Sequence, residues 1–337
     1  MSTAIVYGLD NNLKTARPVM PCGFSRRKPL CLLCGILSTT VVLYIMINII
    51  RGNRNRVTVD VFQTGFFDYN GTHDYDYIFT AQETCRKGRG NQSVFLTVVV
   101  ETAPVKFAER QAIRETWGSW VKLYPNIRLV FLLGLTDNAT QAKLGEENLK
   151  FNDIVQETFI DSYQNLSIKS VAVLRWVSTY CREAKYVLKS DDDMFIHIPN
   201  LINLLMKEKY ERTILGCLVN GAAPIQDPNS KWYTPTSDFP MSTYPDYTSG
   251  TAYVVSGDIV YELYHMALHT KMFWLEDIYI TGICAKRIKA RLVNSAGFTF
   301  FKREVNGCAY KYAISGHDNT VEDIVTIWSD LQQNKTC

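Results

Sequence analysis

The amino-acid sequence predicts an α/β domain with a mostly parallel central sheet, preceded by a single membrane-spanning helix. Short β-branched runs alternate with helix-forming segments between residues 94 and 188, a pattern typical of parallel sheets covered by helices. A run of 21 uncharged residues, 30–50, precedes this alternation. The 337-residue chain is 47% hydrophobic and 20% charged, which is ordinary for a globular protein. Its net charge of +3 is too small to indicate a nucleic-acid partner.

The uncharged run at 30–50 is long enough for one transmembrane helix. Five basic residues precede it and three follow it, which favours a cytosolic N-terminus: Lys14, Arg17, Arg26, Arg27 and Lys28, then Arg51, Arg54 and Arg56. A cleaved signal peptide is the alternative, but it would have a shorter apolar core and a small-residue cleavage site. We therefore expect a cytosolic tail at 1–29, a signal anchor at 30–50, a lumenal stem at 51–92 and a globular domain at 93–337.

Two features beyond the span fit a lumenal, oxidising compartment. Five N-x-S/T sequons lie there, at Asn70, Asn91, Asn138, Asn165 and Asn334. Six cysteines lie there too and permit up to three disulfides in 15 pairings: Cys85, Cys181, Cys217, Cys284, Cys308 and Cys337. Because no C-x-x-C pair occurs outside the span, a zinc site is not indicated.

Four apolar runs joined by helix-forming segments predict the sheet. Strands are expected at 94–100, 127–134, 153–156 and 184–188. Helices are expected between them at 106–117, 140–151 and 167–184, and Gly118 is a natural stop for the first. This repetition of strand and helix predicts strands that run parallel.

The pattern becomes less regular after residue 193. We expect a helix at 201–209, an irregular segment at 211–247, a strand at 253–256 and a helix at 258–269. A last helix is expected to begin near Glu276 and Asp277, where the helix dipole favours carboxylates.

Three consecutive carboxylates, Asp191, Asp192 and Asp193, interrupt an apolar run directly after the expected strand at 184–188. Adjacent carboxylates repel one another and are costly to desolvate, so a divalent cation is a natural partner. Their oxygens suit Mg²⁺ or Mn²⁺, and ligands of α/β sheets bind at the carboxyl ends of strands. A solvated acidic turn is the alternative. An EF-hand loop is excluded, because the alternating ligands, central glycine and final glutamate of that loop are missing.

A second acidic pair, Glu276 and Asp277, offers a free carboxylate for general-base chemistry. Capping of a helix N-terminus is the alternative for this pair. The chain has neither a nucleophile elbow nor a glycine-rich phosphate loop, so covalent acyl chemistry and nucleotide binding of the P-loop kind are not indicated.

Five separated motifs carry a resemblance to a known family. They are R-Q-A-I-R-E-T-W-G at 110–118, F-L-L-G at 131–134, D-D-D at 191–193, Y-P-x-Y-x-S-G at 244–250 and E-D-I-Y-x-x-G at 276–282. In order and spacing the chain resembles the β1,3-glycosyltransferases, which include galactosyl- and N-acetylglucosaminyltransferases and, more distantly, the Fringe enzymes. The resemblance covers residues 94 to about 330, and a stemmed type II anchor is also that family's layout.

This resemblance implies a GT-A fold, a UDP-sugar donor, a glycan acceptor and Mn²⁺. Asp193 and His317 would hold the metal on the UDP diphosphate, where it would offset charge on the leaving group. Asp191 and its neighbour Asp192 would contact the donor. Asp277 would be the catalytic base, taking the proton from an acceptor hydroxyl that attacks the anomeric carbon with inversion.

The resemblance also implies roles for residues around these acids. Arg110 and Arg114 match a helix near the donor nucleotide, with structural salt bridges as the alternative. An acceptor or sugar site would include Trp232, Tyr244, Tyr247, Ser249, Gly250, Trp274 and Glu276. Core packing is the alternative for the four aromatic residues of this set.

One departure from the family pattern affects the disulfides, because Thr248 stands where the family often has cysteine. One usual disulfide is therefore expected to be absent or rearranged. The sequence Glu276-Asp277, in place of Asp-Asp, leans toward the galactosyltransferases.

We therefore expect a type II Golgi membrane enzyme that transfers galactose in β1,3 linkage to a glycoprotein or glycolipid. Transfer from UDP-GlcNAc or UDP-GalNAc is one alternative. A non-catalytic, lectin-like or chaperone relative is another, and the intact acids and His317 weigh against it.

Overall fold

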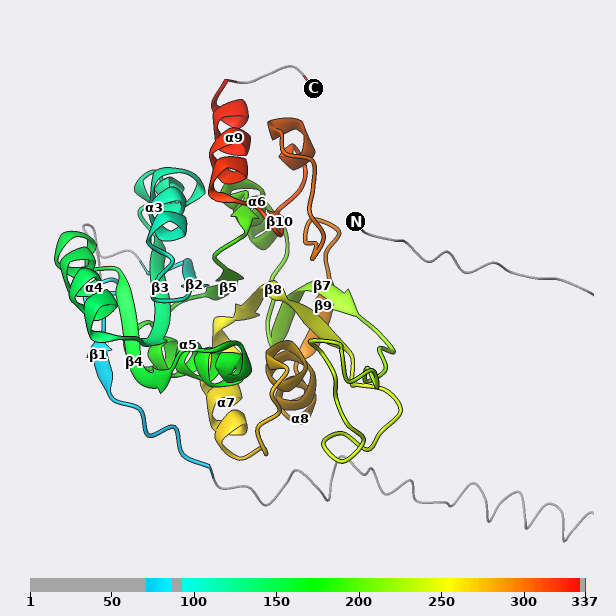
Figure 1. Cartoon of the computed structure of the whole chain (residues 1–337). Helices are drawn as coiled ribbons and strands as arrows, with labels where there is room; N and C mark the ends of the chain where they lie inside the picture. The colour runs from blue at the N-terminus through cyan, green and yellow to red at the C-terminus, as the bar shows by residue number, and fades with distance from the viewer. Residues whose placement is uncertain (1–70, 87–92, 334–336) are drawn as a thin grey trace, which may run out of the picture. The chain divides into compact units, whose positions relative to one another are not determined.

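The computed structural model describes residues 71–86, 93–333 and 337. Its main feature is an eight-stranded mixed sheet with the strand order β1-β4-β3-β2-β5-β8-β7-β9 (Figure 1). The strands are β1 (Tyr77–Phe79), β2 (Leu96–Glu101), β3 (Ile127–Leu135), β4 (Ile154–Ile160), β5 (Tyr186–Asp191), β7 (Thr213–Val219), β8 (Tyr247–Ser256) and β9 (Arg291–Asn294). A separate two-stranded sheet pairs β6 (Phe195–Ile196) with β10 (Ser315–Gly316).

Helices connect these strands. They are α3 (Phe107–Glu115), η1 (Trp117–Lys122), α4 (Asn138–Phe151), η2 (Tyr163–Asn165), α5 (Leu166–Tyr180), α6 (Ile198–Lys207), α7 (Gly257–Leu268), η3 (Ile278–Cys284), α8 (Ala285–Arg287), η4 (Gly307–Tyr310) and α9 (Val321–Gln332). The anchor expected at 30–50 and the sequons Asn70, Asn91 and Asn334 lie outside the described residues. Within the described ranges, no helix has the length and apolar character needed to cross a bilayer.

The predicted alternation of strands and helices is confirmed between residues 94 and 191. Strand β2 pairs in parallel with both β3 and β5, and β3 pairs in parallel with β4. The chain runs from β2 outward to β3 and β4, then returns to β5 on the other side of β2. The strand order therefore reverses between β2 and β5, and at such a point the connections diverge and leave a crevice.

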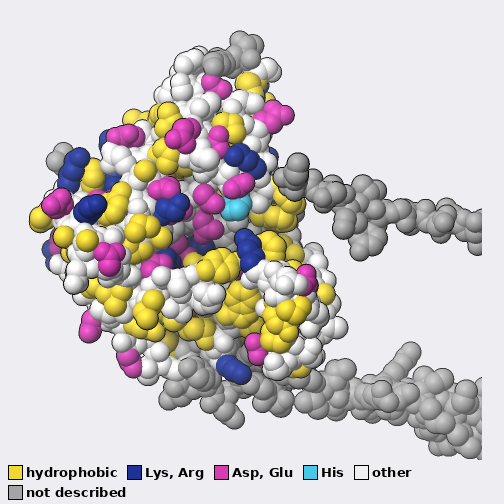
Figure 2. All heavy atoms as spheres, viewed as in Figure 1, with side chains coloured by type: hydrophobic (Ala, Val, Ile, Leu, Met, Phe, Trp, Pro, Cys, Tyr) yellow, Lys and Arg dark blue, Asp and Glu magenta, His cyan; other side chains and the backbone are white. Residues whose placement is uncertain are grey.

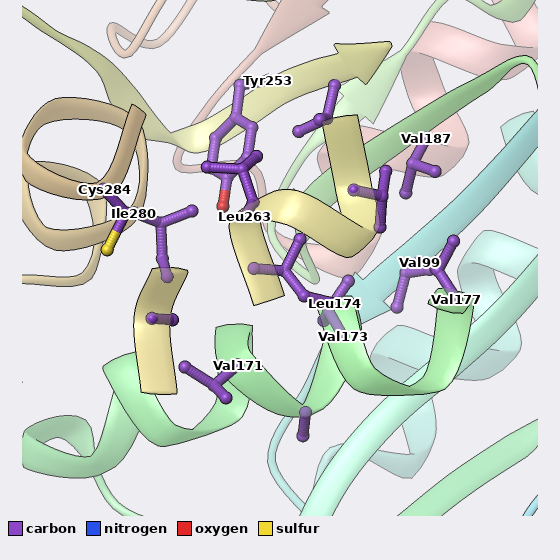
Figure 3. Close-up of a cluster of buried hydrophobic side chains, with 14 of the residues drawn as sticks. Val99, Val171, Val173, Leu174, Val177, Val187, Tyr253, Leu263, Ile280 and Cys284 are labelled. Atoms are coloured by element: carbon purple, nitrogen blue, oxygen red, sulfur yellow. The ribbon is translucent and has the colours of Figure 1, made fainter. Parts of the chain in front are cut away.

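The sheet is buried on both faces because residues of its central strands alternate between two hydrophobic clusters. Val99 and Val187 point toward α5, α7 and η3, where they join Val173 and Leu263 (Figure 3). The opposite face of the same strands, including Val98 and Val100, packs under α3, α6 and α9. The helices thus fix the central strands and the loops that leave their carboxyl ends.

The other half of the sheet differs from the expectation. Residues 213–219 form β7, so the prediction of an irregular segment throughout 211–247 is wrong at its start. Strand β7 pairs antiparallel with β8, which begins at Tyr247 and not at residue 253. Gly216 inside β7 obscures the strand pattern in the sequence. Glycine suits this position, because a Cβ there would lie only 3.2 Å from Cβ of Tyr253. Tertiary pairing, not local propensity, makes this segment a strand.

Elements near both ends of the described chain were not expected from the sequence. Strand β1 lies inside the segment assigned to a stem and pairs antiparallel with β4. Helix α9 begins at a capping box formed by Thr320 and Asp323. Strand β1 thus extends the folded region beyond the expected N-terminal boundary at 93, and α9 adds a helix within the expected domain.

Two disulfides form among the six cysteines, Cys85–Cys181 and Cys308–Cys337. Cys217 and Cys284 are free thiols, so a third disulfide is absent from the described residues. Thr248 instead bonds through its backbone to the Thr281 hydroxyl, from N to Oγ1 at 2.9 Å. The expectation that one usual disulfide is missing is consistent with this arrangement.

Candidate active site

The acid triplet lies where the strand order reverses. Asp191 is the last residue of β5 and pairs in register with Glu101, the last residue of β2. Asp192 and Asp193 follow in the turn between β5 and β6. The carboxylates therefore lie at the crevice outside the carboxyl ends of β2 and β5, as the sequence pattern predicts.

A return of the chain brings a histidine to these acids. Strand β10 pairs with β6, with Gly316 opposite Phe195, so His317 follows directly beside the turn. The Nε2 atom of His317 lies 3.2 Å from Oδ2 of Asp193. The backbone N–H of Asn319 donates to the Asp193 carbonyl at 2.9 Å and fixes the two segments together. Residues more than a hundred positions apart are thus joined at one point.

The donor atoms at this point fit a divalent cation. Oxygens of Asp191 and Asp193 and a nitrogen of His317 lie within 4.8 Å of one another. The Oδ1 atom of Asp193 is buried and has no hydrogen-bond partner. Two carboxylates and an imidazole suit a divalent cation, and a bound cation would satisfy the unpaired oxygen.

Titration of these groups reflects their crowding. Burial raises the pKa of Asp191 above its ordinary value, although the Lys189 ammonium acts in the opposite direction. A hydrogen bond with Asp193 raises the pKa of His317. Burial also raises the pKa of Asp192 to about 6. The Asp192 carboxylate contacts a different residue, Thr102, whose hydroxyl donates to its Oδ2 at 2.7 Å. Asp192 is therefore not part of the cation-binding group.

Asp277 forms a second acidic wall of the same crevice, at the start of η3. Its Oδ1 accepts a hydrogen bond from the N–H of Ile278 at 2.8 Å, and its Oδ2 accepts one from the N–H of Gly250 at 3.3 Å. Burial raises the pKa of Asp277, which makes the ionised form a stronger base. The capping alternative is also realised, so this residue both caps a helix and faces the cavity.

Glu276 is more deeply placed than its neighbour. The Tyr253 hydroxyl donates to its Oε1 at 2.6 Å, and its Oε2 lies 3.7 Å from the ammonium of Lys189. Only 6% of Glu276 is exposed, and burial raises its pKa. Both carboxylate oxygens of Glu276 therefore have partners within the protein.

A cavity of about 690 Å³ joins the two acidic walls. Of the predicted site residues, Asp191, Trp232, Tyr244, Tyr247, Ser249, Gly250, Trp274, Glu276, Asp277 and His317 line it. Figure 2 shows acidic side chains beside a histidine on this face, with hydrophobic side chains gathered next to them. Trp232 is 46% exposed, whereas Tyr244 is 7% exposed and packs on Phe239 and Phe273, so Tyr244 also serves the core.

Arg110 and Arg114 do not line the cavity. Arg110 is fully buried, bonds to Glu147 with its Nη2 at 2.7 Å and donates to the carbonyl of Ala103. Arg114 bridges Glu147 and Asp153 at 2.7 and 2.8 Å. These contacts show the salt bridges that were the alternative: both arginines tie α3 to Glu147 of α4, and Arg114 also pairs with Asp153, just before β4. Donor binding by either arginine stays a prediction.

The sequence reasoning missed several lining residues, including Tyr163, Lys189, Phe300 and Phe301. Lys189 precedes the acid triplet by two positions, so its side chain points to the same side of β5 as Asp191. This alternation of side chains along a strand is the sequence pattern that could have identified Lys189 as a lining residue. Phe300 and Phe301 lie in a loop without any periodic pattern, and only the tertiary path back to His317 brings them to the cavity.

Of the two sequons in the described residues, Asn138 is exposed at the start of α4. Asn165 is half-buried, and its Nδ2 donates to the carbonyl of Ile160 at 2.8 Å. Glycosylation at either residue stays a prediction.

Comparison with known proteins agrees with this geometry. The family model described as Galactosyltransferase matches residues 108–296. Beta-1,3-galactosyltransferase 1 of Mus musculus is 36% identical over 269 residues, covering 78% of this chain and 80% of that protein. Beta-1,3-galactosyltransferase 2 of Pongo abelii is 34% identical over 278 residues, covering 79% of this chain and 64% of that protein.

Likenesses to solved structures are more distant. The bifunctional glycosyltransferase WbbM superposes with a TM-score of 0.41 at 11% identity, covering 71% of this chain and 50% of that one.

Proposed function

The chain belongs to the galactosyltransferase family of glycosyltransferases, and from that premise we propose that it transfers galactose from UDP-galactose to a glycan hydroxyl in β1,3 linkage. The single observation that carries the proposal is the cavity with a cation-binding group on one wall and Asp277 on the other. The two relatives described above are beta-1,3-galactosyltransferases, which favours galactose and a β1,3 bond. A GT-A architecture is proposed with it, on the parallel strands that end in the acid triplet.

The donor would bind at the acid triplet. Asp191, Asp193 and His317 would hold Mn²⁺, which supplies charge neutralisation for the departing diphosphate. The unpaired Oδ1 of Asp193 supports this assignment. Asp191 and Asp193 alone would repel a diphosphate, so a cation between them and the donor is required by charge.

Asp277 would act as the general base. Its carboxylate takes the proton of the acceptor hydroxyl as that oxygen forms a bond to the anomeric carbon. The bond from that carbon to UDP breaks on the opposite face, so the configuration inverts. The two backbone N–H donors at Ile278 and Gly250 orient the carboxylate without using all its lone pairs, which leaves it able to accept the proton.

Exposed aromatic side chains support a carbohydrate acceptor beside Asp277. Trp232 and Tyr163 both line the cavity, with 46% and 44% of their surfaces exposed. Flat apolar rings that remain accessible in a cavity suit the apolar faces of sugar rings.

We also propose a Golgi location, with a type II anchor at 30–50. The two disulfides support an oxidising compartment for the folded domain, and the uncharged run supports a membrane anchor.

The direct test measures UDP release by the full chain in detergent with Mn²⁺. Donors are UDP-galactose, UDP-GlcNAc and UDP-GalNAc, each with galactose-, GlcNAc- and GalNAc-terminated acceptors. Release with UDP-galactose, and a β1,3 bond in the isolated product, is the expected result. Preference for another donor would keep the mechanism and reject galactose. A folded chain that binds no UDP with Mn²⁺ would contradict the proposal.

A further inference from the structure

A buried lysine that the transfer scheme does not use lies between the two walls of the site. Lys189 is the fourth residue of β5, and only 4% of its side chain is exposed. A buried ammonium is costly unless hydrogen bonds and opposite charges surround it. The contacts that it makes therefore show what holds it in place.

The two shortest contacts of Lys189 go to different walls of the cavity. Its Nζ donates to Oδ1 of Asp191 and to the carbonyl oxygen of Gly250, each at 2.7 Å. Two further carboxylates are more distant, with Oε2 of Glu101 at 3.4 Å and Oε2 of Glu276 at 3.7 Å. The Gly250 carbonyl is neutral, so this bond does not offset buried carboxylate charge; it links Lys189 of β5 to β8.

Gly250 connects this contact to the proposed base. The carbonyl of Gly250 accepts from Lys189, and its N–H donates to Oδ2 of Asp277 at 3.3 Å. A Cβ at Gly250 would lie 2.8 Å from Oε2 of Glu276 and 3.2 Å from Cβ of Asp277. The β8 backbone thus approaches both acids closely, and its position sets the position of the base.

We propose that Lys189 is a positioning residue for sugar transfer, whose ammonium ties Asp191 on the donor wall to the Gly250 peptide and thereby keeps Asp277 in register with the donor. The inference rests on the proposed function. Reacting groups must lie within a fraction of an ångström of their productive arrangement, and misplacement by about 1 Å costs on the order of 100-fold in rate. One rigid link between the two walls meets that requirement.

The test must separate positioning from charge balance. Lys189→Met alone leaves three carboxylates uncompensated, so we combine it with Glu101→Gln, which restores the formal charge of the wild-type cluster. Glu101→Gln alone is the matched control, because Glu101 touches neither Gly250 nor Asp277 in the contacts above. All variants are full chains in detergent, and kcat is expressed per Mn²⁺-dependent UDP site, counted by titration calorimetry.

We expect kcat per UDP site to fall about 100-fold in the double variant relative to the Glu101→Gln control. The KM values for donor and acceptor should change by less than about tenfold. A purely structural lysine would reduce the number of UDP sites and leave kcat per site unchanged, and kcat within threefold of the control would overturn the inference.

Lys189→Arg decides the question if the double variant fails to fold. Arginine keeps the positive charge but replaces a compact ammonium by a planar fork that cannot reproduce both 2.7 Å contacts. A loss of at least tenfold in kcat per site is expected, and wild-type kcat would overturn the inference. A folded, UDP-binding wild-type chain with no transfer to any acceptor would overturn the proposed function and this inference together.

Discussion

Two clusters of buried charge in this protein are built differently. In the first, Arg110 and Arg114 meet Glu147 and Asp153, so each carboxylate has a guanidinium partner. In the second, the strand-end cluster, Lys189 is the lysine of the described residues that forms ion pairs with Glu101, Asp191 and Glu276. The first cluster is balanced in formal charge, and the second has an excess of carboxylates.

The pKa shifts follow this difference. Burial acts to raise the pKa of Glu147, but hydrogen bonds from Arg110 and Arg114 outweigh it and lower that pKa. Burial raises the pKa of Glu276 and Asp191, and raises that of Glu101 to about 7, because one lysine cannot offset three carboxylates. A balanced cluster is complete without a ligand, whereas an unbalanced cluster beside a cavity suits an added cation.

The largest effect on kcat is expected at Asp277, the proposed base beside the unbalanced strand-end cluster. Asp277→Asn should lower kcat by about 10² to 10⁴-fold, because asparagine keeps the size of the side chain and one of its two accepting oxygens but cannot take the proton. Initial rates of UDP release measure this loss. Asp238→Asn, an exposed aspartate outside the cavity lining, should leave kcat unchanged. Activity of Asp277→Asn within tenfold of wild type would remove Asp277 as the base.

A substitution in the balanced cluster should lower the free energy of unfolding and leave the catalytic parameters unchanged. Arg110→Met should lower the free energy of unfolding by about 3–5 kcal/mol, because it leaves Glu147 short of a partner in a buried place. Chemical denaturation measures the change, with the exposed Arg182→Met as control. At temperatures where the variant is folded, the donor KM should equal that of wild type. A raised donor KM at unchanged stability would restore the donor-binding role of Arg110.

The dependence of kcat on pH should report the raised pKa of Asp277. A base must be ionised to work, and burial shifts its pKa upward, so kcat should rise with pH through a midpoint above the ordinary aspartate value of about 3.9. Below that midpoint, kcat should fall about tenfold per pH unit. Rates at saturating Mn²⁺ and substrates, with circular dichroism at each pH, test this. A flat profile in folded protein down to pH 4 would contradict it.

The smallest effect is expected at the aromatic wall, away from both charge clusters. Trp232→Ala should raise the acceptor KM by about tenfold and leave the donor KM unchanged, because one ring face is lost. Leu149→Ala, 89% exposed on α4, is the matched control for loss of an exposed apolar side chain. An equal rise in donor KM for Trp232→Ala would place this ring on the donor side.

The sequence predicted the parallel half of the sheet because its strands are continuous apolar runs that need no partner to be recognised. It did not predict β7, whose glycine and cysteine obscure the pattern, or β1, which lies in a polar segment. These two strands exist because β8 and β4 offer edges to pair with, which is information that no local window contains.

The residues of the candidate site were likewise only partly predictable from the sequence. Consecutive carboxylates after a buried strand predicted the position of Asp191 and Asp193, and the family resemblance supplied Asp277 and His317. The two roles of Arg110 and Arg114 were left open, because spacing on one helix face cannot tell a ligand contact from a salt bridge to Glu147. Lys189 was overlooked because its role depends on a carbonyl from another strand.

The most direct measurement is titration calorimetry of UDP binding with and without Mn²⁺, on wild type, Asp193→Ala and Asp277→Asn. The central claim is that the acidic cavity has a cation-binding wall and a separate base. It predicts that Asp193→Ala loses Mn²⁺-dependent UDP binding, while Asp277→Asn binds UDP as tightly as wild type. Equal loss in both variants, or wild-type binding by Asp193→Ala, would contradict the division of roles.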